Sequence, residues 1–240
     1  MKILAKQHAL LISLLLSLSL LSGCATIEGE ADPDDPLESF NRAMYGFNDT
    51  LDRTVLKPVA QGYNAVLPAP VNKGVSNFFS NIDDVVVLFN DILQLKFDQT
   101  LHDGARIFFN TTIGLLGIFD VASGMDLPKH DEDFGQTLGY WGVDTGAYIV
   151  WPFFGPSNVR DTVGLIGDAY VNPLYDVEPR GDRTALVVVD VIDRRAGLLS
   201  ASKILEEAAL DPYLFVRDAY LQRRENLVYD GNPPKQKFDE

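Results

Sequence analysis

The only cysteine of this 240-residue chain, Cys24, ends an apolar N-terminal run, and this arrangement limits how the chain can be stabilised. Lys2 and Lys6 precede residues 9–21, a run interrupted only by serines, and the small pair Ser22-Gly23 follows. A basic start, an apolar core and small residues at a cleavage point are typical of a signal peptide. Because one cysteine cannot form an internal disulfide, we expect packing alone to stabilise the folded part in an oxidising compartment.

The segment Leu21-Ser22-Gly23-Cys24 resembles the lipobox of bacterial lipoproteins. Lipobox chemistry needs a thiol that accepts diacylglycerol, small residues at the cleaved bond, and a freed amine that takes a further acyl chain. The resemblance implies that residues 1–23 are removed and that Cys24 becomes an N-acyl, S-diacylglycerol cysteine, a stable anchor because it carries several chains. Ala25 stands where lipoproteins of the inner membrane usually have Asp, which favours the outer membrane of a Gram-negative bacterium. The alternative is an ordinary secretory signal with a buried cysteine.

The chain is acidic, with 20 Lys and Arg against 34 Asp and Glu and a formal net charge of −14. Since no cluster of Lys or Arg interrupts this excess, we expect no nucleic acid among the partners. An acidic surface also repels anionic lipid headgroups. Contact with a bilayer beyond the anchor must therefore come from apolar area. The alternative explanation of the acidic charge is solubility alone, because a high net charge keeps proteins apart.

Composition divides the mature chain into a tether, a body and a tail. Residues 24–34 are small and acidic and lack apolar periodicity, which is typical of a flexible tether. Residues 230–240 are polar and proline-bearing, so we expect a disordered tail. No internal repeat or low-complexity linker divides residues 35–229, which we interpret as one domain.

Apolar residues at three- and four-residue steps predict amphipathic helices in the body. One stripe runs through residues 75–93, after Pro68-Ala69-Pro70, with Asn and Asp residues largely on the other side. Residues 213–229 follow the same rule. Residues 185–210 suit one long helix or two short ones, although Leu186-Val187-Val188-Val189 favours a strand by propensity.

Apolar residues also crowd between Arg106 and Asp120, with Gly114 and Gly117 among them. The stretch 106–122 is shorter than the roughly 20 apolar residues that a membrane-spanning helix needs. Two interpretations remain open. It is a buried core helix, or it is a re-entrant or interfacial hairpin in which the glycines bend the backbone while Arg106 and Asp120 stay at the polar level.

Catalytic signals are nearly absent. His102 and His130 are the only histidines after the signal, and no nucleophile elbow, phosphate-binding loop or metal-ligand spacing accompanies them. We therefore expect no enzymatic activity and no cofactor. The run His130-Asp131-Glu132-Asp133 can in principle hold a divalent cation, but such a run is more often a solvated loop, so we expect no metal site.

Five blocks of glycine, proline, aromatic and charged residues follow one another along the body. They are residues 35–42 with 44–48 (DPLESFNR and MYGFN); Arg106, Asn110, Gly114, Gly117 and Asp120; Phe134-Gly135, Leu138-Gly139 and Gly142; Pro152-Phe153, Gly155-Pro156 and Arg160-Asp161; and Asp211-Pro212-Tyr213, Arg217, Ala219-Tyr220 and Gln222-Arg223. In this order they resemble the MlaA (VacJ) family of outer-membrane lipoproteins. One block alone is a weak signal, whereas five in order are a strong one.

The resemblance implies an all-α, single-domain helical ring, embedded in the inner leaflet of the outer membrane, with a central amphipathic channel. It also implies a function without catalysis, in which mislocalised phospholipids leave the outer leaflet and pass to a periplasmic lipid carrier of the Mla system, so that lipid asymmetry is maintained. Trimeric outer-membrane porins are implied as further partners. Helices with one polar and one apolar face suit this role, because a headgroup needs a polar path and its acyl chains need apolar surface.

The resemblance assigns roles to a few residues. Phe47 and Asn48 become candidates for channel gating, with helix packing as the alternative. Arg160 is a possible contact for a headgroup phosphate, although we favour local pairing with Asp161 and a helix cap. Gly114 and Gly117 become candidates for a membrane-embedded hairpin, since glycines allow close approach and sharp turns.

A function of another class also fits the sequence. A structural envelope lipoprotein would scaffold an outer-membrane assembly without handling lipid. Purified protein distinguishes the two, because a transporter carries phospholipid or transfers it to a carrier protein, whereas a scaffold does neither.

Overall fold

The structure is a computed structural model that describes residues 35–234. The predicted signal peptide 1–23, the lipid-attachment residue Cys24, the rest of the tether to residue 34 and residues 235–240 of the predicted tail lie outside the described residues. The first residues of that tail are described. Asp230 accepts a hydrogen bond from Lys96 Nζ at 2.6 Å, and Gly231 N donates to Asn226 O at 2.9 Å.

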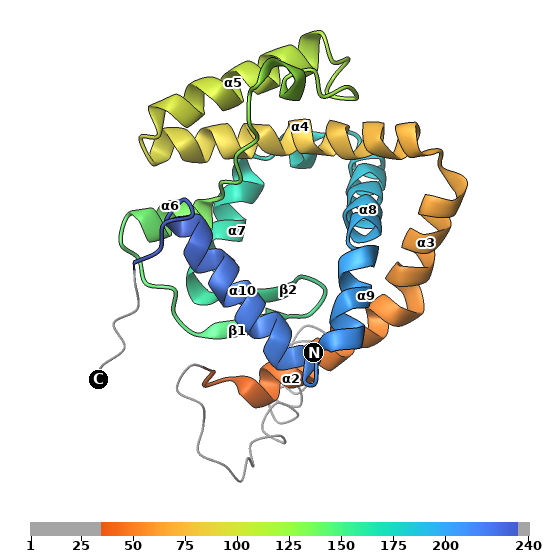
Figure 1. Ribbon diagram of the computed structural model, residues 1–240, viewed down its shortest axis with the longest axis vertical. Helices are drawn as coiled ribbons and strands as arrows, with labels where there is room; N and C mark the ends of the chain where they lie inside the picture. Colours follow the sequence, from red (N-terminus) through yellow and green to blue (C-terminus); the bar gives the residue numbers. More distant parts are fainter. Residues whose placement is uncertain (1–34, 235–240) are drawn as a thin grey trace, which may run out of the picture.

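The described residues are predominantly α-helical, as expected from the sequence (Figure 1). The α-helices are α2 (Glu38–Leu51), α3 (Lys57–Val66), α4 (Ala69–Leu93), α5 (Phe97–Thr112), α6 (Phe134–Tyr140), α7 (Val159–Val171), α8 (Arg180–Gly197), α9 (Leu199–Ala208) and α10 (Pro212–Val228). A π-helical turn, η2 (Asp52–Leu56), joins α2 to α3, and 3-10 turns occupy Ser123–Met125 (η3) and Pro173–Asp176 (η4). An antiparallel hairpin of β1 (Tyr148–Trp151) and β2 (Gly155–Asn158) departs from the expected all-α composition.

Two of the predicted helices begin at residues that are typical of helix N-termini, a proline in one case and a capping aspartate in the other. Pro70 lies in the first turn of α4, where its missing N–H costs nothing. The Asp211 side chain accepts hydrogen bonds from the backbone N–H groups of Tyr213 and Leu214, which caps α10. The predictions of helices at 75–93 and 213–229 are therefore confirmed.

The ambiguous stretch 185–210 forms two helices, α8 and α9, which meet at Leu198. The valine-rich run inside it is helical despite its strand propensity, because tertiary contacts outweigh propensity there. Asp193 of α8 accepts hydrogen bonds from Tyr63 Oη of α3 at 2.8 Å and from Ser76 Oγ of α4 at 3.0 Å. These buried contacts join α8 to both neighbouring helices.

The elements are arranged as a ring around an open centre (Figure 1). The α4–α5 helical hairpin forms one edge, and α3, α8 and α9 form the adjoining side. The other side consists of α6, α7, α10 and the β-hairpin, and α2 completes the circuit below. The start of α10 therefore lies near α2, where Tyr213 Oη donates to Asp35, while the end of α10 lies beside α6.

The distribution of buried residues is unusual. Among residues 35–234, buried polar and charged side chains outnumber buried hydrophobic ones. The main apolar cluster is small and consists of Tyr148, Val150 and Tyr213. On α4, Asp84 and Asp91 are fully buried whereas Ile92 is exposed. A water-soluble domain normally shows the reverse, so this ring favours surroundings that are apolar in part.

Candidate functional site

A cavity of about 530 Å³ lies between the N-terminal and C-terminal parts of the ring. Its walls come from α2, η2, the start of α3, the β-hairpin, the junction of α8 and α9, and the start of α10. Six of its lining side chains are charged: Asp49, Asp52, Arg53, Lys57, Arg195 and Glu206. None of these six residues belongs to a motif recognisable in the sequence. We call this space the charged cavity.

Two ion pairs connect opposite walls of the charged cavity. Arg195 of α8 donates from Nε and Nη2 to the two carboxylate oxygens of Asp52, at 2.6 and 2.7 Å. Lys57 Nζ donates to both carboxylate oxygens of Glu206, at 2.7 and 2.9 Å. The hydrogen bonds to Asp52 raise the pKa of Arg195 above its ordinary value. Asp52 begins the π-helical turn η2 and Lys57 directly follows it; such turns are rare and are frequent at functional sites.

Asn48, a predicted gating residue, binds the β-hairpin that walls the charged cavity. Its Nδ2 donates to Trp151 O at 2.9 Å, and its Oδ1 accepts from Phe153 N at 2.8 Å. Phe47, the other gating candidate, packs edge-to-face on Phe153 with 5.3 Å between ring centroids. Both residues therefore contact the tip of the hairpin. Their role in gating stays a prediction.

Asn41 makes the same kind of contact two helical turns earlier. Its Nδ2 donates to Tyr148 O at 3.1 Å, and its Oδ1 accepts from Val150 N at 2.8 Å. The seven-residue spacing places Asn41 and Asn48 on one face of α2, so together they bind the length of the strand. The sequence contained this spacing, but it did not reveal the strand that both amides recognise.

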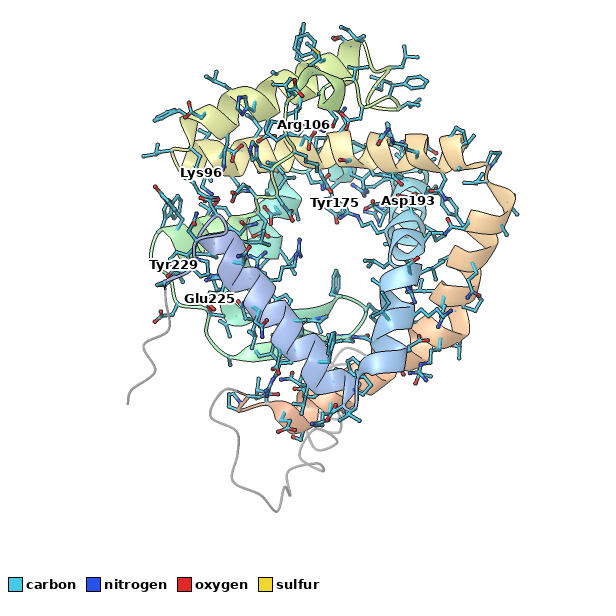
Figure 2. All side chains as sticks on the ribbon, in the orientation of Figure 1. Lys96, Arg106, Tyr175, Asp193, Glu225 and Tyr229 are labelled. Carbon is cyan, nitrogen blue, oxygen red and sulfur yellow. The ribbon has the colours of Figure 1, made fainter. Side chains whose placement is uncertain are left out.

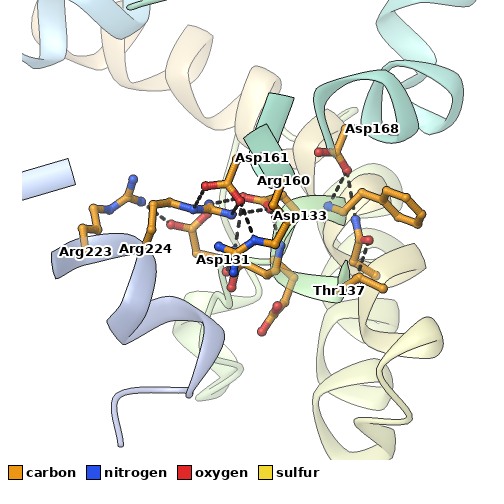
Figure 3. Close-up of polar contacts among 12 residues, drawn as sticks. Asp131, Asp133, Thr137, Arg160, Asp161, Asp168, Arg223 and Arg224 are labelled. Atoms are coloured by element: carbon orange, nitrogen blue, oxygen red, sulfur yellow. Dashed lines mark hydrogen bonds and ion pairs between the residues drawn. The ribbon is translucent and has the colours of Figure 1, made fainter. Parts of the chain in front are cut away.

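A buried charge cluster joins α10 to α6 and α7 (Figure 3). Arg224 donates to both oxygens of Asp133, at 2.5 and 2.9 Å, and to Asp161 at 3.0 Å. Tyr220 Oη donates to the second oxygen of Asp161 at 2.7 Å. Burial opposes ionisation of Asp133, but the hydrogen bonds from Arg224 hold its pKa below the usual value. Arg224 thus keeps the carboxylate of Asp133 charged inside the protein.

Arg160, the predicted headgroup contact, belongs to the same cluster. Its Nε donates to Asp161 Oδ1 at 3.0 Å, so it pairs with its neighbour in the chain. The cap of α7 comes from another residue, because Asn158 Oδ1 accepts from Asp161 N at 2.7 Å. Arg160 also borders a second cavity of about 330 Å³ between α6 and α10. A headgroup contact at Arg160 stays a prediction.

The stretch 106–122 is not the buried core helix of the first interpretation. Helix α5 ends at Thr112, and residues 113–119 form a tight loop in which Leu115, Leu116 and Gly117 all have positive φ. Leu115 is 60 % exposed and Leu116 is 63 % exposed. A Cβ on Gly117 would lie 2.4 Å from Asn81 Cβ, so only glycine fits this close approach.

Polar residues of the same block hold this loop. Asn110 Nδ2 donates to Asp120 Oδ1 at 3.1 Å, while Asn110 Oδ1 accepts from Ala122 N at 3.0 Å. Arg106 Nη2 donates to the same Asp120 oxygen at 3.2 Å. The exposed leucines therefore project from a loop with a rigid polar base. None of the helices described between residues 35 and 234 has the length and apolar character to cross a membrane.

In the acidic run 130–133, Asp131 is exposed, as expected of a solvated loop, whereas Glu132 is buried. His130 Nδ1 contacts Asp103 Oδ2 at 2.7 Å, Asp131 pairs with Arg223, and Glu132 accepts from Lys96 Nζ at 2.6 Å. These partners come from α5, α10 and the α4–α5 turn, and sequence spacing does not reveal them. Within the part of the chain that the structure describes, no group of three or more His, Cys, Asp or Glu is arranged to hold a metal ion. The ring of His102 stacks on that of His130, with 6.2 Å between centroids.

Fold and cavity together define a class of protein: a helical ring with buried polar contacts, a charged cavity and an apolar exposed surface. The model of the family described as MlaA lipoprotein matches residues 33–227. The chain is 37 % identical over 227 residues to the "Intermembrane phospholipid transport system lipoprotein MlaA" of Shigella flexneri, covering 92 % of this chain and 89 % of that one. It is 35 % identical over 230 residues to the protein of the same name from Haemophilus influenzae, covering 92 % and 91 %.

A solved structure described as "Structural basis for maintenance of bacterial outer membrane lipid asymmetry" has a similar fold. Its TM-score is 0.72 at 34 % sequence identity, covering 81 % of this chain and 98 % of that chain. The chain belongs to the MlaA lipoprotein family. The resemblance inferred from the five sequence blocks is thereby confirmed.

Proposed function

We propose that this protein is an outer-membrane lipoprotein that removes mislocalised phospholipids from the outer leaflet and passes them to a periplasmic lipid carrier. The observation that carries the proposal is the charged cavity inside a ring whose outside exposes large apolar side chains. Relatives that align with nearly the whole chain carry the name of an intermembrane phospholipid transport system. Transport of an intact lipid needs no bond cleavage, so the proposed function is not enzymatic.

The ion pairs of the charged cavity suit a polar headgroup. A phosphate can replace the carboxylate partner of Arg195 or Lys57, because both cations bind phosphate and carboxylate with similar geometry. A headgroup amine can in turn contact Asp52 or Glu206. Because the headgroup exchanges its hydrating water for these charged side chains, the free-energy cost of moving it away from water is lower.

The loop 113–119 suits insertion into the inner leaflet of the outer membrane. Its leucines lie outward, and Gly114 and Gly117 form the turn that presents them. A Cβ on Gly114 would lie 2.1 Å from Phe119 O, so this glycine also has no substitute. The polar base formed by Arg106 and Asp120 would remain at the headgroup level.

Phe47 and Asn48 would act as gating residues through the β-hairpin. Both contact the hairpin tip, and the hairpin supplies one wall of the charged cavity. A shift of the tip would change the width of the cavity. Arg160 would contact a headgroup phosphate in the second cavity, with its Nη groups, while Nε stays bonded to Asp161.

Cys24, acylated after cleavage of the signal peptide, would anchor the protein. The proposed partners are phospholipids, a periplasmic carrier of the Mla system and trimeric porins of the outer membrane. Cys24→Ala should cause mislocalisation and loss of lipid asymmetry. Full activity of an unacylated, soluble form would overturn the proposed role of the anchor.

Deletion of the gene tests the function itself. Outer-leaflet phospholipid should rise, and the cells should become sensitive to a detergent combined with a chelator. Purified protein should also carry bound phospholipid or transfer it to the carrier, which a scaffold would not do. Unchanged outer-leaflet phospholipid in the deletion strain would contradict the proposal.

A further inference from the structure

A third concave surface, of about 590 Å³, lies on the other side of the β-hairpin. It is formed by α7, the hairpin and η4, and we call it the α7 groove. Its main lining side chains are Trp151, Phe154, Leu165, Ile166, Tyr170 and Tyr175. No charged residue lines it, although the chain carries a net charge of −14. Tyr175, labelled in Figure 2, lies beside α4 at the edge of the open centre.

The two faces of one hairpin separate the α7 groove from the charged cavity. Successive residues of a strand point to opposite faces. Val150 of β1 lines the charged cavity together with its cross-strand partner Pro156, whereas Trp151 lines the α7 groove. The hairpin is therefore a thin partition between a charged compartment and an apolar one.

The indole N–H of Trp151 and the hydroxyl of Thr162, both in the α7 groove, already have hydrogen-bond partners within the protein. Trp151 Nε1 donates to Thr162 Oγ1 at 2.9 Å, and Thr162 Oγ1 donates to Asn158 O at 2.7 Å. An occupant therefore needs no hydrogen-bonding group where it contacts Trp151 and Thr162. Trp151 and Thr162 are half-buried, whereas other lining side chains are strongly exposed, with Phe154 at 80 % and Tyr170 at 86 %. Large apolar side chains gathered in this way usually mark a binding surface.

We propose that the α7 groove binds an acyl chain of the phospholipid whose headgroup enters the charged cavity. This inference rests on the proposed transport function and names the part of the site that takes the lipid tail. The two compartments match the two halves of an amphiphile: charge on one face of the hairpin, and an uncharged aromatic and aliphatic surface on the other. A polar ligand would make no favourable contact in the uncharged groove. An acyl chain without a headgroup would leave the charged cavity empty. An amphiphile fills both compartments.

Tryptophan fluorescence tests the proposal, because the chain contains only Trp141 and Trp151. Trp141 does not line the groove, so Trp141→Phe leaves Trp151 as the sole reporter. The full-length acylated protein in detergent is titrated with phosphatidylethanolamine brominated on one acyl chain. We expect saturable quenching of Trp151. Glycerophosphoethanolamine, which has the headgroup but no acyl chain, should relieve this quenching when it is in large excess, because it competes for the charged cavity.

Two substitutions on α7 give a matched pair. Ile166 lines the groove and is 61 % exposed, whereas Val163 is 51 % exposed and does not line it. Ile166→Asp should raise the lipid concentration for half-maximal quenching by about tenfold, because it places a charge against the chain. Val163→Asp should leave that concentration unchanged. Both positions are exposed, so neither variant should unfold.

Two outcomes would overturn the groove proposal. One is quenching that rises with lipid content without saturation, to the same extent in all variants. This would mean that the groove only contacts the hydrocarbon interior of the micelle or bilayer and binds no particular acyl chain. The other concerns the deletion strain, if its outer-leaflet phospholipid is raised. In this outcome, expression of the Ile166→Asp variant in that strain would return outer-leaflet phospholipid fully to its normal level. In that second case the transport function stands and only the acyl-chain site fails. If deletion leaves outer-leaflet phospholipid normal, the transport function fails instead, whatever the quenching shows.

Discussion

At the scale of single residues, the side-chain amide of Asn48 makes hydrogen bonds to the backbone of the β-hairpin that a third strand would otherwise make. It accepts from Phe153 N and donates to Trp151 O, so it binds the hairpin as a neighbouring strand would. Asn48→Ala should lower the free energy of unfolding by about 1–3 kcal/mol, because both backbone groups lose their partner. Thermal unfolding followed by circular dichroism in detergent measures this loss.

Thr50→Ala is the matched control for Asn48→Ala. Thr50 is exposed two residues further along α2, and its hydroxyl bonds only to Gly46 O within the helix. Its substitution should change stability by less than about 0.5 kcal/mol. Equal losses for the two variants would show that the hairpin contacts of Asn48 contribute little.

Asp91 makes stability depend on pH. It is fully buried on α4, and burial, together with the neighbouring carboxyl group of Asp103, raises its pKa to about 8. A folded-state pKa above the unfolded value means that the stabilisation is present at low pH and is lost as pH rises toward 8. Asp91→Asn imitates the protonated form at every pH. The Tm of this variant should therefore increasingly exceed that of the wild type between pH 5 and pH 8.

The control for Asp91→Asn is Asp176→Asn, which removes one negative charge at an exposed position in η4. The difference in Tm between this variant and the wild type should stay constant over the same pH range. Parallel Tm curves for Asp91→Asn and the wild type would contradict protonation of Asp91 in the folded protein.

At the scale of elements, the loop 113–119 is a rigid apolar projection. The double substitution Leu115→Asp/Leu116→Asp should leave the fold intact, since both side chains are exposed. Loss of the apolar contact of two leucine side chains with lipid weakens the free energy of vesicle binding by about 3 kcal/mol or more. The unacylated Cys24→Ala protein with both changes should therefore co-float at least about tenfold less with vesicles of phosphatidylethanolamine and phosphatidylglycerol.

Leu210→Asp serves as the control for these leucines, because Leu210 is exposed in the α9–α10 connection. It should reduce vesicle binding little. If the loop variant floats as well as its parent, the loop does not insert into lipid.

At the scale of the whole molecule, buried ion pairs close the ring. Arg224→Ala leaves Asp133 and Asp161 buried without their main cation, which should cost about 3–5 kcal/mol. Arg223 is its neighbour in the chain, but it pairs with Asp131 at the surface, where both side chains are 65 % exposed. Arg223→Ala should cost less than about 1 kcal/mol. Chemical denaturation of both variants measures the difference, and similar losses would refute a special role for the buried pair.

Much of the helical structure could be predicted from the sequence, because its signals are local. The spacing of apolar residues and the positions of proline and aspartate defined α4 and α10 to within a few residues. The end of α5 at Thr112 could not be predicted, since it depends on Gly117 packing against Asn81. The β-hairpin was also missed, because the side chains of Asn41 and Asn48 complete its hydrogen bonding.

The sequence by itself determined the absence of internal disulfides, the acidic charge, the main amphipathic helices and the family, through blocks of neighbouring residues. Only the tertiary structure decided which helix faces are buried and how the charged cavity is lined. Asp52 and Arg195, like Lys57 and Glu206, are more than a hundred residues apart, so no local pattern relates them. Burial of Asp84 likewise depends on Arg106 of α5 and on Lys129, which lie elsewhere in the chain. The physical reason is that a charged group is stable inside a protein only when distant parts of the chain supply its partner.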